Sequence, residues 1–423
     1  MTPKPSWIAA ALVAGLLSAL STSARCNDTD ALNLESAPAA QRSAGSPLRL
    51  AFELSLGRVE AQADGSTQSG RRISVDLRYG RQLTDQWRVA FSDRVDDTHP
   101  VLFGQRSTVN SLREAHLSWQ RLGDSMTADL GRVNVRQGPA FGYNPTDYFR
   151  AGALRTITTA DPVTLREMRL GTFMLRLGTL WSDGGVSLAI APKLAEGPDP
   201  DPWSIDAGAT NSRDRGLLTV NGKPASWLNL QGSLLIERGS SAQAGLSATA
   251  LASDALVVHA EFSTGELPRI FDQVTGLNPM PVRTQQAALG LTYTLPTTTA
   301  VTLEAQYNGA GLDQTEWNSL MAQGAPAYAR YLSLTQRSQE LGTRNGWLLY
   351  VNHKGLGTKQ LDFTGFVRSN PNDGSRLLWG ELRYHWRHFD AAIQWQRSIG
   401  DAHTEFGALP QRQIIQLLGV IYL

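Results

Sequence analysis

The amino-acid sequence predicts an all-β fold, a single antiparallel up-and-down β-barrel that crosses a membrane with about 18 strands; 16 is the alternative count. Three observations lead to this prediction. Apolar and polar residues alternate along many short stretches, short and long connections take turns between these stretches, and the chain begins with an export signal. A closed barrel has no free strand edge, and strands that cross a lipid bilayer require that closure.

The N-terminus has the features of a secretory signal peptide. Lys4 precedes an apolar run from Trp7 to Leu20, and the small residues Thr22 and Ala24 follow it. The run has about 14 residues, fewer than the roughly 20 that a membrane-spanning helix needs. We therefore expect residues 1–24 to be a cleaved signal peptide and residues 25–47 a short periplasmic segment. The barrel should occupy residues 48–423 and carry inserted loops at 134–164 and 308–345.

Alternation with a period of two identifies the strands. In "LRLAFELSL", residues 48–56, the leucines and Phe52 alternate with arginine, alanine, glutamate and serine, as expected of a strand with one apolar face. The same pattern recurs to the end of the chain. The predicted strands are centred near residues 53, 76, 91, 117, 129, 173, 188, 218, 231, 247, 259, 290, 304, 350, 363, 382, 394 and 418.

The connections indicate which end of the barrel faces which side. Every second connection is short, among them "LTDQ", "RLGDS" and "WSDGG", whereas most of the others are longer, including residues 134–164, 192–213, 264–284 and 308–345. Outer-membrane barrels have short periplasmic turns and long extracellular loops. A soluble β-sandwich has no reason to sort its connections in this way.

The polar faces of the strands carry charged side chains that a dry core would not tolerate but a wet lumen would. These residues are predicted to line the lumen: Arg49, Glu53, Asp76, Arg78, Arg88, Glu114, His116, Glu261, Glu304, Arg368, Glu381, Arg383 and Arg387. The apolar faces carry tryptophan and tyrosine near many strand ends, where aromatic girdles meet lipid headgroups.

Composition and motifs exclude several other classes of protein. The formal net charge is +1, which gives no support to a nucleic-acid-binding protein. The seven histidines are scattered and form no recognisable nucleophile or metal motif, so we expect no enzyme, no catalytic residue, no metal and no cofactor. Cys26 is the only cysteine, so no intramolecular disulfide stabilises the chain.

The signal peptide, the barrel pattern, "LGR" at residues 130–132 and Asn-Pro-x-Asp at 144–147 together resemble the porin and alginate-export type of Gram-negative outer-membrane barrel. The likeness covers nearly the whole mature chain as architecture, but only residues 130–170 as motif. It implies an 18-strand channel whose extracellular loops partly fold inwards. The last strand departs from the usual barrel ending, because it ends in Leu423 and its aromatic residue, Tyr422, is displaced by one position.

The connection around "GYNPTDYFR", residues 142–150, has two interpretations. It is either an ordinary folded cap or a loop that enters the lumen and narrows it. Loops of this length are usually functional or disordered, and the aromatic residues argue against disorder. Between residues 134 and 166 there are four arginines and two aspartates. The predicted pore-constriction residues are Arg136, Asp147, Arg150, Arg155, Asp161 and Arg166.

The second long loop, residues 308–345, differs because apolar residues recur at helical spacing on both sides of "GAP". One or two short helices are expected there, serving either as a packed lid or as a gate or receptor surface.

These observations predict a porin-like channel of the cell outer membrane for passive passage of small polar or weakly anionic solutes, constricted by loop 134–164. The alternatives are an exopolysaccharide export conduit of the alginate-export type and a plugged barrel that acts as a receptor or structural protein. Expected partners are outer-membrane lipid and lipopolysaccharide, the barrel-assembly machinery, and a small solute or polysaccharide, with no nucleic acid.

Overall fold

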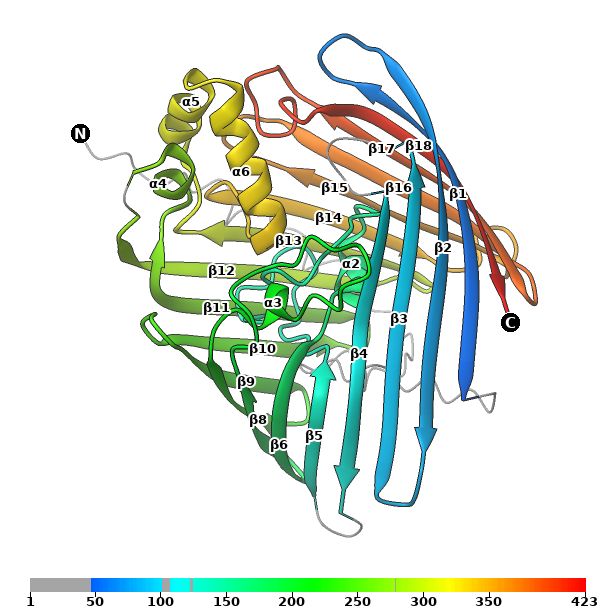
Figure 1. Cartoon of the computed structure of the whole chain (residues 1–423), viewed down its shortest axis with the longest axis vertical. Coiled ribbons are helices and arrows are strands. Elements are labelled where there is room, and N and C mark those ends of the chain that lie inside the picture. Colours follow the sequence, from blue (N-terminus) through cyan, green and yellow to red (C-terminus); the bar gives the residue numbers. More distant parts are fainter. Residues whose placement is uncertain (1–46, 101–106, 122–124, 278) are drawn as a thin grey trace.

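The computed structural model describes residues 47–100, 107–121, 125–277 and 279–423. The predicted signal peptide and the segment 25–46 lie outside the described residues. The described chain forms one closed barrel of 18 antiparallel strands, as the sequence predicted (Figure 1). Each strand pairs with its neighbours in the sequence, and the first strand pairs with the last.

The strands follow the predicted order. They are β1 (Leu48–Ala61), β2 (Thr67–Gln82), β3 (Trp87–His99), β4 (Thr108–Gln120), β5 (Met126–Val133), β6 (Thr172–Trp181), β7 (Gly184–Ala191), β8 (Arg215–Ala225), β9 (Leu228–Glu237), β10 (Gln243–Ser253), β11 (Leu256–Pro268), β12 (Pro281–Thr294), β13 (Thr299–Asn308), β14 (Asn345–His353), β15 (Leu361–Ser369), β16 (Arg376–His385), β17 (Phe389–Ile399) and β18 (Gln411–Tyr422).

Pairing between β1 and β18 closes the barrel. The register runs from Ala51 opposite Tyr422 to Ala61 opposite Gln411. The other edge of β1 pairs with β2 from Leu48 to Glu60. Closure leaves no exposed strand edge at this seam, which is the condition for a sheet to exist in lipid.

The two faces of the wall differ as the period of two requires. In β1, Phe52, Leu54 and Leu56 are exposed on the outside, whereas Ser55 and Val59 are buried inside. Exposed leucines, isoleucines and valines recur on the outer faces of most other strands. An apolar outer belt and a polar interior are the arrangement of a barrel whose solvent outside is lipid.

Connections of two kinds mark the two ends of the barrel. The short ones span residues 83–86, 121–125, 182–183, 226–227, 254–255, 295–298, 354–360 and 386–388. The opposite end, which we call the long-connection end, carries residues 134–171, 192–214, 269–280, 309–344 and the remaining connections. The predicted sorting of connections is therefore present in the structure.

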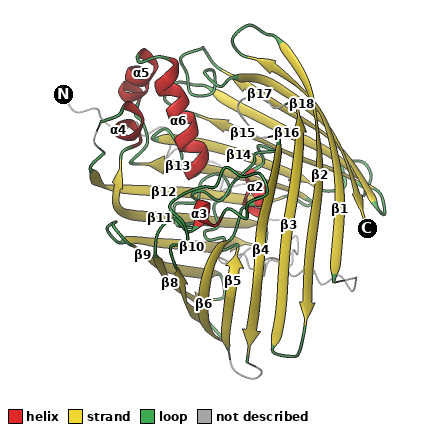
Figure 2. Ribbon diagram, viewed as in Figure 1, coloured by secondary structure: helices red, strands yellow, loops and turns green. Residues whose placement is uncertain are grey.

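In the described part of the chain, five helices lie in the long connections (Figure 2). Helices α5 (Gln314–Ala322) and α6 (Ala325–Ser338) confirm the prediction for residues 308–345. They pack with α4 (Ile270–Thr275) around Trp317, Leu320 and Tyr331; we call α4, α5 and α6 the helical cap. No helix in the described part of the chain is long and apolar enough to cross a membrane.

Two further helices were not predicted. Helix α3 (Ala207–Thr210) is a single turn, and α2 (Pro162–Met168) lies in the connection that was predicted to be either a folded cap or a loop that enters the lumen. The reason for α2 is local: the Asp161 carboxylate accepts hydrogen bonds from the backbone N–H groups of Val163 and Thr164, and Pro162 occupies the first turn. Both features favour the start of a helix.

Candidate functional site

The connection between β5 and β6, residues 134–171, runs inside the barrel; we call it the inner segment. Its contacts show how it crosses the lumen. It leaves the wall at β5 and reaches residues on β11, β13 and β15 before returning to β6. Apolar packing holds one side of it, since Phe149 lies among Val133, Met174, Leu217 and other buried side chains of the wall from β5 to β9.

The carboxylate of Glu304 on β13 holds the middle of the inner segment. It accepts three backbone N–H groups in succession, from Phe141 at 2.7 Å and from Gly142 and Tyr143 at 3.1 Å each. The Glu304 side chain is fully buried, and His259 lies 3.4 Å from it. Charge-assisted hydrogen bonds to a buried carboxylate are among the stronger ones in proteins, so this contact fixes the backbone of the segment.

Glu261 on β11 makes a second anchor beside the first. Its carboxylate accepts the N–H of Ala140 at 2.7 Å, the hydroxyl of Thr146 at 2.7 Å and the amide of Asn144 at 3.1 Å. Gly138, which has a positive φ of 81°, lies so close to Glu261 that an added Cβ would stand 2.3 Å from the carboxylate. Glycine is therefore required there both for its backbone conformation and for space.

Charged groups of the inner segment are occupied by contacts within the protein. Arg150 pairs with Glu340, which follows α6, and donates to the backbone oxygen of Asp147 at 3.1 Å. The Asp147 side chain has no exposed area and pairs with Arg169 at 2.5 Å. Tyr143 donates its hydroxyl to Glu340 at 2.8 Å, and burial together with the charge of Glu340 raises the pKa of this phenol well above its ordinary value.

The other predicted constriction residues make similar contacts. Arg155 donates to the backbone oxygens of Asn110 and Ser204 at 2.6 and 2.5 Å and pairs with Asp206 at 3.2 Å. Arg166 donates to the backbone oxygen of Gln137 at 2.8 Å, and Asp161 caps α2. Arg136 is half-buried. Five of the six predicted side chains are therefore bound to other groups of the protein.

Open space lies on the other side of the inner segment. A cavity of about 680 Å³, which we call the vestibule, opens toward the short-connection end along β1–β4 and β14–β18. A cavity of about 130 Å³ continues it, and a third of about 290 Å³, the mouth cavity, lies under the helical cap. Arg72 and Thr158 line both the first and the second cavity, and Ile157 lines both the second and the third.

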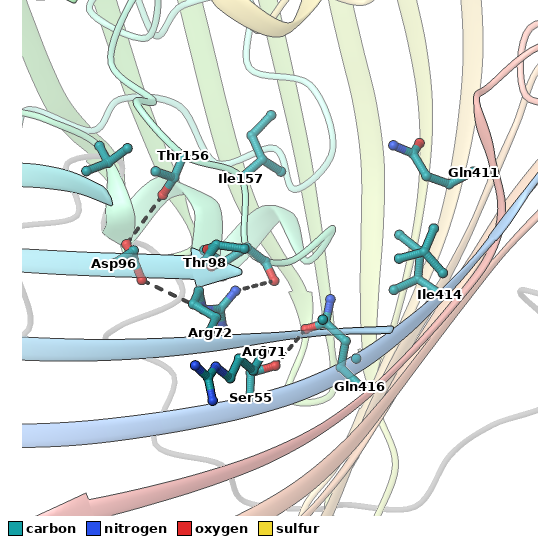
Figure 3. Close-up of a pocket in the computed structure, with 15 residues that line it drawn as sticks. Ser55, Arg71, Arg72, Asp96, Thr98, Thr156, Ile157, Gln411, Ile414 and Gln416 are labelled. Atoms are coloured by element: carbon teal, nitrogen blue, oxygen red, sulfur yellow. Dashed lines mark hydrogen bonds and ion pairs between the residues drawn. The ribbon is translucent and has the colours of Figure 1, made fainter. Parts of the chain in front are cut away.

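The second cavity lies between the wall and the inner segment (Figure 3). Thr156 and Ile157 approach it from the inner segment, and Arg72 faces them from β2. Thr156 donates its hydroxyl to Asp96 at 3.4 Å, and Arg72 donates to the backbone oxygen of Thr158 at 3.5 Å. The gap between segment and wall is therefore lined by charged groups of the wall and backbone of the segment.

Three arginines and three carboxylates form a continuous network on this wall. Arg72 pairs with Glu53 at 2.5 Å, and Arg94 pairs with Glu53 at 3.1 Å and with Asp96 at 3.0 Å. Arg94 also lies 3.7 Å from Asp76, which in turn pairs with Arg113 at 2.6 Å. We call these six residues, Glu53, Arg72, Asp76, Arg94, Asp96 and Arg113, the wall network. Its formal charges cancel, so it presents dipoles rather than a strong net field.

The fold on which this site is built has known relatives among solved structures. The chain matches OccAB1 of Acinetobacter baumannii with a TM-score of 0.56 and 12% sequence identity, over 89% of this chain and 96% of that one. It matches OccK5 (OpdH) of Pseudomonas aeruginosa with a TM-score of 0.52 and 11% identity, over 89% and 98%. The chain has the fold of a Gram-negative outer-membrane porin.

Sequence comparisons add nothing to this porin fold, since neither the family models nor the curated proteins gave a match. OpdQ of Pseudomonas aeruginosa, with a TM-score of 0.52, is only 9% identical over 90% of this chain. At such identities the likeness concerns the fold. The predicted resemblance is confirmed for the porin fold, whereas the alginate-export type stays a prediction.

The residues predicted to line the lumen of this porin fold lie as follows. Arg49, Glu53, Asp76, Arg78, Glu381 and Arg383 line the vestibule. Glu261, Glu304 and Arg368 instead contact the inner segment, Arg368 through the backbone oxygen of Gly142 at 3.1 Å. Arg88, Glu114 and His116 lie on β3 and β4, in register with the face that carries Arg78.

Arg387 requires a correction. It lies in the turn 386–388 between β16 and β17 and not on a strand face, because β16 ends at His385 and β17 begins at Phe389. Its prediction as a lumen residue continues the alternation of β16 two residues beyond the end of that strand. A turn residue has no partner strand to fix its side, so a period of two says nothing about where its side chain lies.

Several residues of the site were not among those predicted from the sequence. Arg72, Arg94 and Asp96 lie on polar faces of strands that were predicted correctly, so the same period of two could have identified them. Arg113 could not be found in this way, because the register shifts in β4 next to it and puts it and Glu114 on the same side. Glu340 and Arg169 carry no signal in the sequence.

Proposed function

We propose that this chain is an outer-membrane channel for passive passage of small polar or weakly anionic solutes. The observation that carries the proposal is the inner segment, which is anchored on Glu261 and Glu304 across a closed barrel while leaving cavities along β1–β4. A segment anchored on one side narrows the lumen without filling it. We take the short-connection end as periplasmic, as in other outer-membrane barrels.

We further propose that the narrowest part of the route lies between Thr158 and Arg72, where the vestibule meets the second cavity. This proposal changes the roles of the residues predicted for the constriction. Arg150, Arg155 and Arg166 hold the inner segment in place through their contacts, and the wall network faces the solute at this narrowest part. Arg150 and Arg166 also line the mouth cavity. Selectivity then arises from fixed charges at close quarters.

The charge of the route favours weak selectivity. The vestibule is lined by six arginines, Arg49, Arg72, Arg78, Arg94, Arg113 and Arg383, and by six carboxylates, Glu53, Asp76, Asp161, Glu167, Glu381 and Asp390. A conduit for an acidic polymer would need an excess of positive charge along its length. The balanced lining therefore supports small solutes over an acidic polysaccharide.

Conductance of the purified protein in planar bilayers tests the proposal. Steady single-channel openings are expected, and a variant that lacks residues 139–160 should conduct more, because those residues occupy the lumen. Both variants should show weak ion selectivity. The proposal fails if the full-length chain conducts no ions, as a plugged barrel would, or if reversal potentials show clear cation selectivity.

A further inference from the structure

The barrel wall is incomplete as a sheet at one place. Pairing between β4 and β5 ends at Ala115 opposite Arg132, whereas β4 continues to Thr108 without a strand on that edge. β5 and β7 have eight residues each, fewer than the roughly 9–11 that a tilted transmembrane strand uses. Residues 198–206, "PDPDPWSID", lie against this gap; we call them the wall segment.

The wall segment lies on the outer side of β5. Leu130 on β5 is exposed on the outer face, and Arg132, two residues further along the same face, is fully buried. The Arg132 guanidinium lies 5.1 Å from the ring centroid of Phe173, the residue opposite it in β6. It donates to the backbone oxygens of Ile205 and Asp206, so the end of the wall segment covers it from outside.

Most backbone oxygens of the wall segment accept hydrogen bonds from the protein. Asn110 of β4 donates its N–H to Pro202 at 2.7 Å, and Arg155 of the inner segment donates to three more backbone oxygens, those of Asp199, Asp201 and Ser204. With the two that Arg132 binds, six of the nine backbone oxygens accept hydrogen bonds from these donors.

The backbone N–H groups of the wall segment are satisfied in the same way. Pro198, Pro200 and Pro202 have no N–H to satisfy. Side chains of the segment itself accept most of the others: Asp206 accepts from Asp199 at 2.8 Å, Asp199 from Asp201 at 2.9 Å, and Asp201 from Trp203 at 2.8 Å. A loop in water needs no such internal completeness, but backbone in contact with lipid does.

Two large apolar side chains of this segment are nonetheless exposed, Trp203 at 63% and Ile205 at 48%. Their height along the wall follows from their partners. The backbone oxygen of Pro202 accepts a hydrogen bond from the N–H of Asn110, which is the eleventh residue of β4 counted from Gln120. A strand crosses the membrane in roughly 9–11 residues, so Pro202 lies near the outer boundary of the membrane. The backbone oxygen of Ile205 accepts a hydrogen bond from the side chain of Arg132, which pairs with Ala115 of β4. Ala115 is closer to Gln120 than Asn110 is, so Ile205 lies deeper in the membrane than Pro202.

We propose that the wall segment is a membrane contact: it replaces strand in the outer half of the barrel wall, with Ile205 among the acyl chains of the outer leaflet and Trp203 at the headgroup boundary. The exposed face of the wall segment continues the apolar outer belt of the neighbouring strands, so we assign lipid as its partner. Tryptophan at that boundary matches the position of aromatic girdles. The proposal rests on the outer-membrane location proposed above.

This contact also bears on the channel. Arg155 belongs to the inner segment and reaches the wall segment through the gap, where it pairs with Asp206 at 3.2 Å and bonds the Ser204 oxygen at 2.5 Å. Lipid that fixes the position of the wall segment therefore also fixes, through Arg155, the part of the inner segment that carries Thr156 and Thr158.

Nitroxide labels at single cysteines test the proposal in phosphatidylcholine vesicles, in the full chain with Cys26→Ser. Ile205→Cys and Trp203→Cys are compared with Leu54→Cys on the outer face of β1 and with Gln323→Cys on the helical cap. We expect the ratio of oxygen accessibility to nickel-chelate accessibility at 205 to lie within about twofold of that at 54, and at 203 to be intermediate, because oxygen partitions into lipid.

A ratio at position 205 equal to that at 323 would overturn the inference. A water-like ratio at position 54 would instead refute the membrane location itself, so the two failures are distinguishable. Trp203→Phe provides a measurement that needs no label: brominated lipid should quench a smaller share of the total tryptophan emission in this variant than in the parent. An unchanged quenched share would also contradict the proposal.

Discussion

Removing the Glu304 carboxylate should loosen the inner segment. Glu304→Ala leaves the N–H groups of Phe141, Gly142 and Tyr143 without their acceptor. Hydrogen bonds to charged groups contribute about 1.5–3 kcal/mol each, so the three together have an upper limit of about 5–9 kcal/mol. Because water in the lumen can hydrate the freed donors, we expect about 3 kcal/mol, or roughly a hundredfold change in the ratio of released to docked segment.

The expected result is a channel that visits larger conductance levels and shows more open-channel noise than the parent. Glu304→Gln should have an intermediate effect, because the amide keeps one acceptor oxygen but not the charge. Glu381→Gln is the matched control: this carboxylate also faces the lumen, but its hydrogen bonds come from Arg383 at 2.7 Å and Gln394 at 2.6 Å, both on the barrel wall. Folded Glu304→Ala protein with the conductance and noise of the parent would refute the reasoning.

Three other predictions concern the wall network, the mouth cavity and the wall segment. Glu53→Gln removes the partner of two arginines and should raise anion over cation permeability by about two- to threefold in reversal-potential measurements. Glu60→Gln should not, because Glu60 lies near the other end of β1, on the opposite face from Glu53, and pairs with Arg412. Burial, with a smaller effect from Asp373, raises the pKa of Glu405 to about 7. The stability that residues 400–410 gain from protonated Glu405 should therefore be fully present below about pH 4.5 and be lost as the pH rises through 7. Hydrogen exchange should show this loss in the parent and not in Glu405→Gln. Arg132→Lys should lower the unfolding temperature in a gel-shift assay, because lysine cannot bond three backbone oxygens in the geometry of a guanidinium, and an unchanged temperature would contradict that assignment.

The number of strands and the inner and outer faces of each strand followed from the sequence because they depend on local patterns. In β1 each side chain has either lipid or lumen as its surroundings, so alternation in "LRLAFELSL" is imposed residue by residue. Connection lengths are equally local. The helices around Trp317 and Tyr331 were predictable for the same reason, since their apolar residues recur at helical spacing.

The position of the inner segment could be anticipated only in part. Its content indicated a structured loop, but no local pattern says that Glu304, more than 160 residues away from Phe141 in the chain, supplies the acceptor for three successive N–H groups. The arginines looked like solute-facing charges because the sequence does not show their partners. Arg150 pairs with Glu340 and Arg155 with Asp206, and both pairings depend on how distant connections pack.

The wall segment shows a different limit. "PDPDPWSID" reads as an ordinary proline-rich loop, and its place in the wall depends on where β5 stops and on the direction of Arg132. The tripeptide that contains Arg132, "LGR", contributed to the resemblance to porins but suggested no role. The structure supplies one, because Arg132 joins the β5 end to the wall segment.

The central claim is that solute passes between the inner segment and the wall network at Thr158. The most direct test is Thr158→Cys in the Cys26→Ser chain, followed through modification by a bulky methanethiosulfonate in a planar bilayer. The account predicts a stepwise fall in single-channel conductance on modification, with no step for Gln323→Cys on the helical cap. Complete labelling of position 158 with unchanged conductance would contradict it, because the route would then lie elsewhere in the barrel.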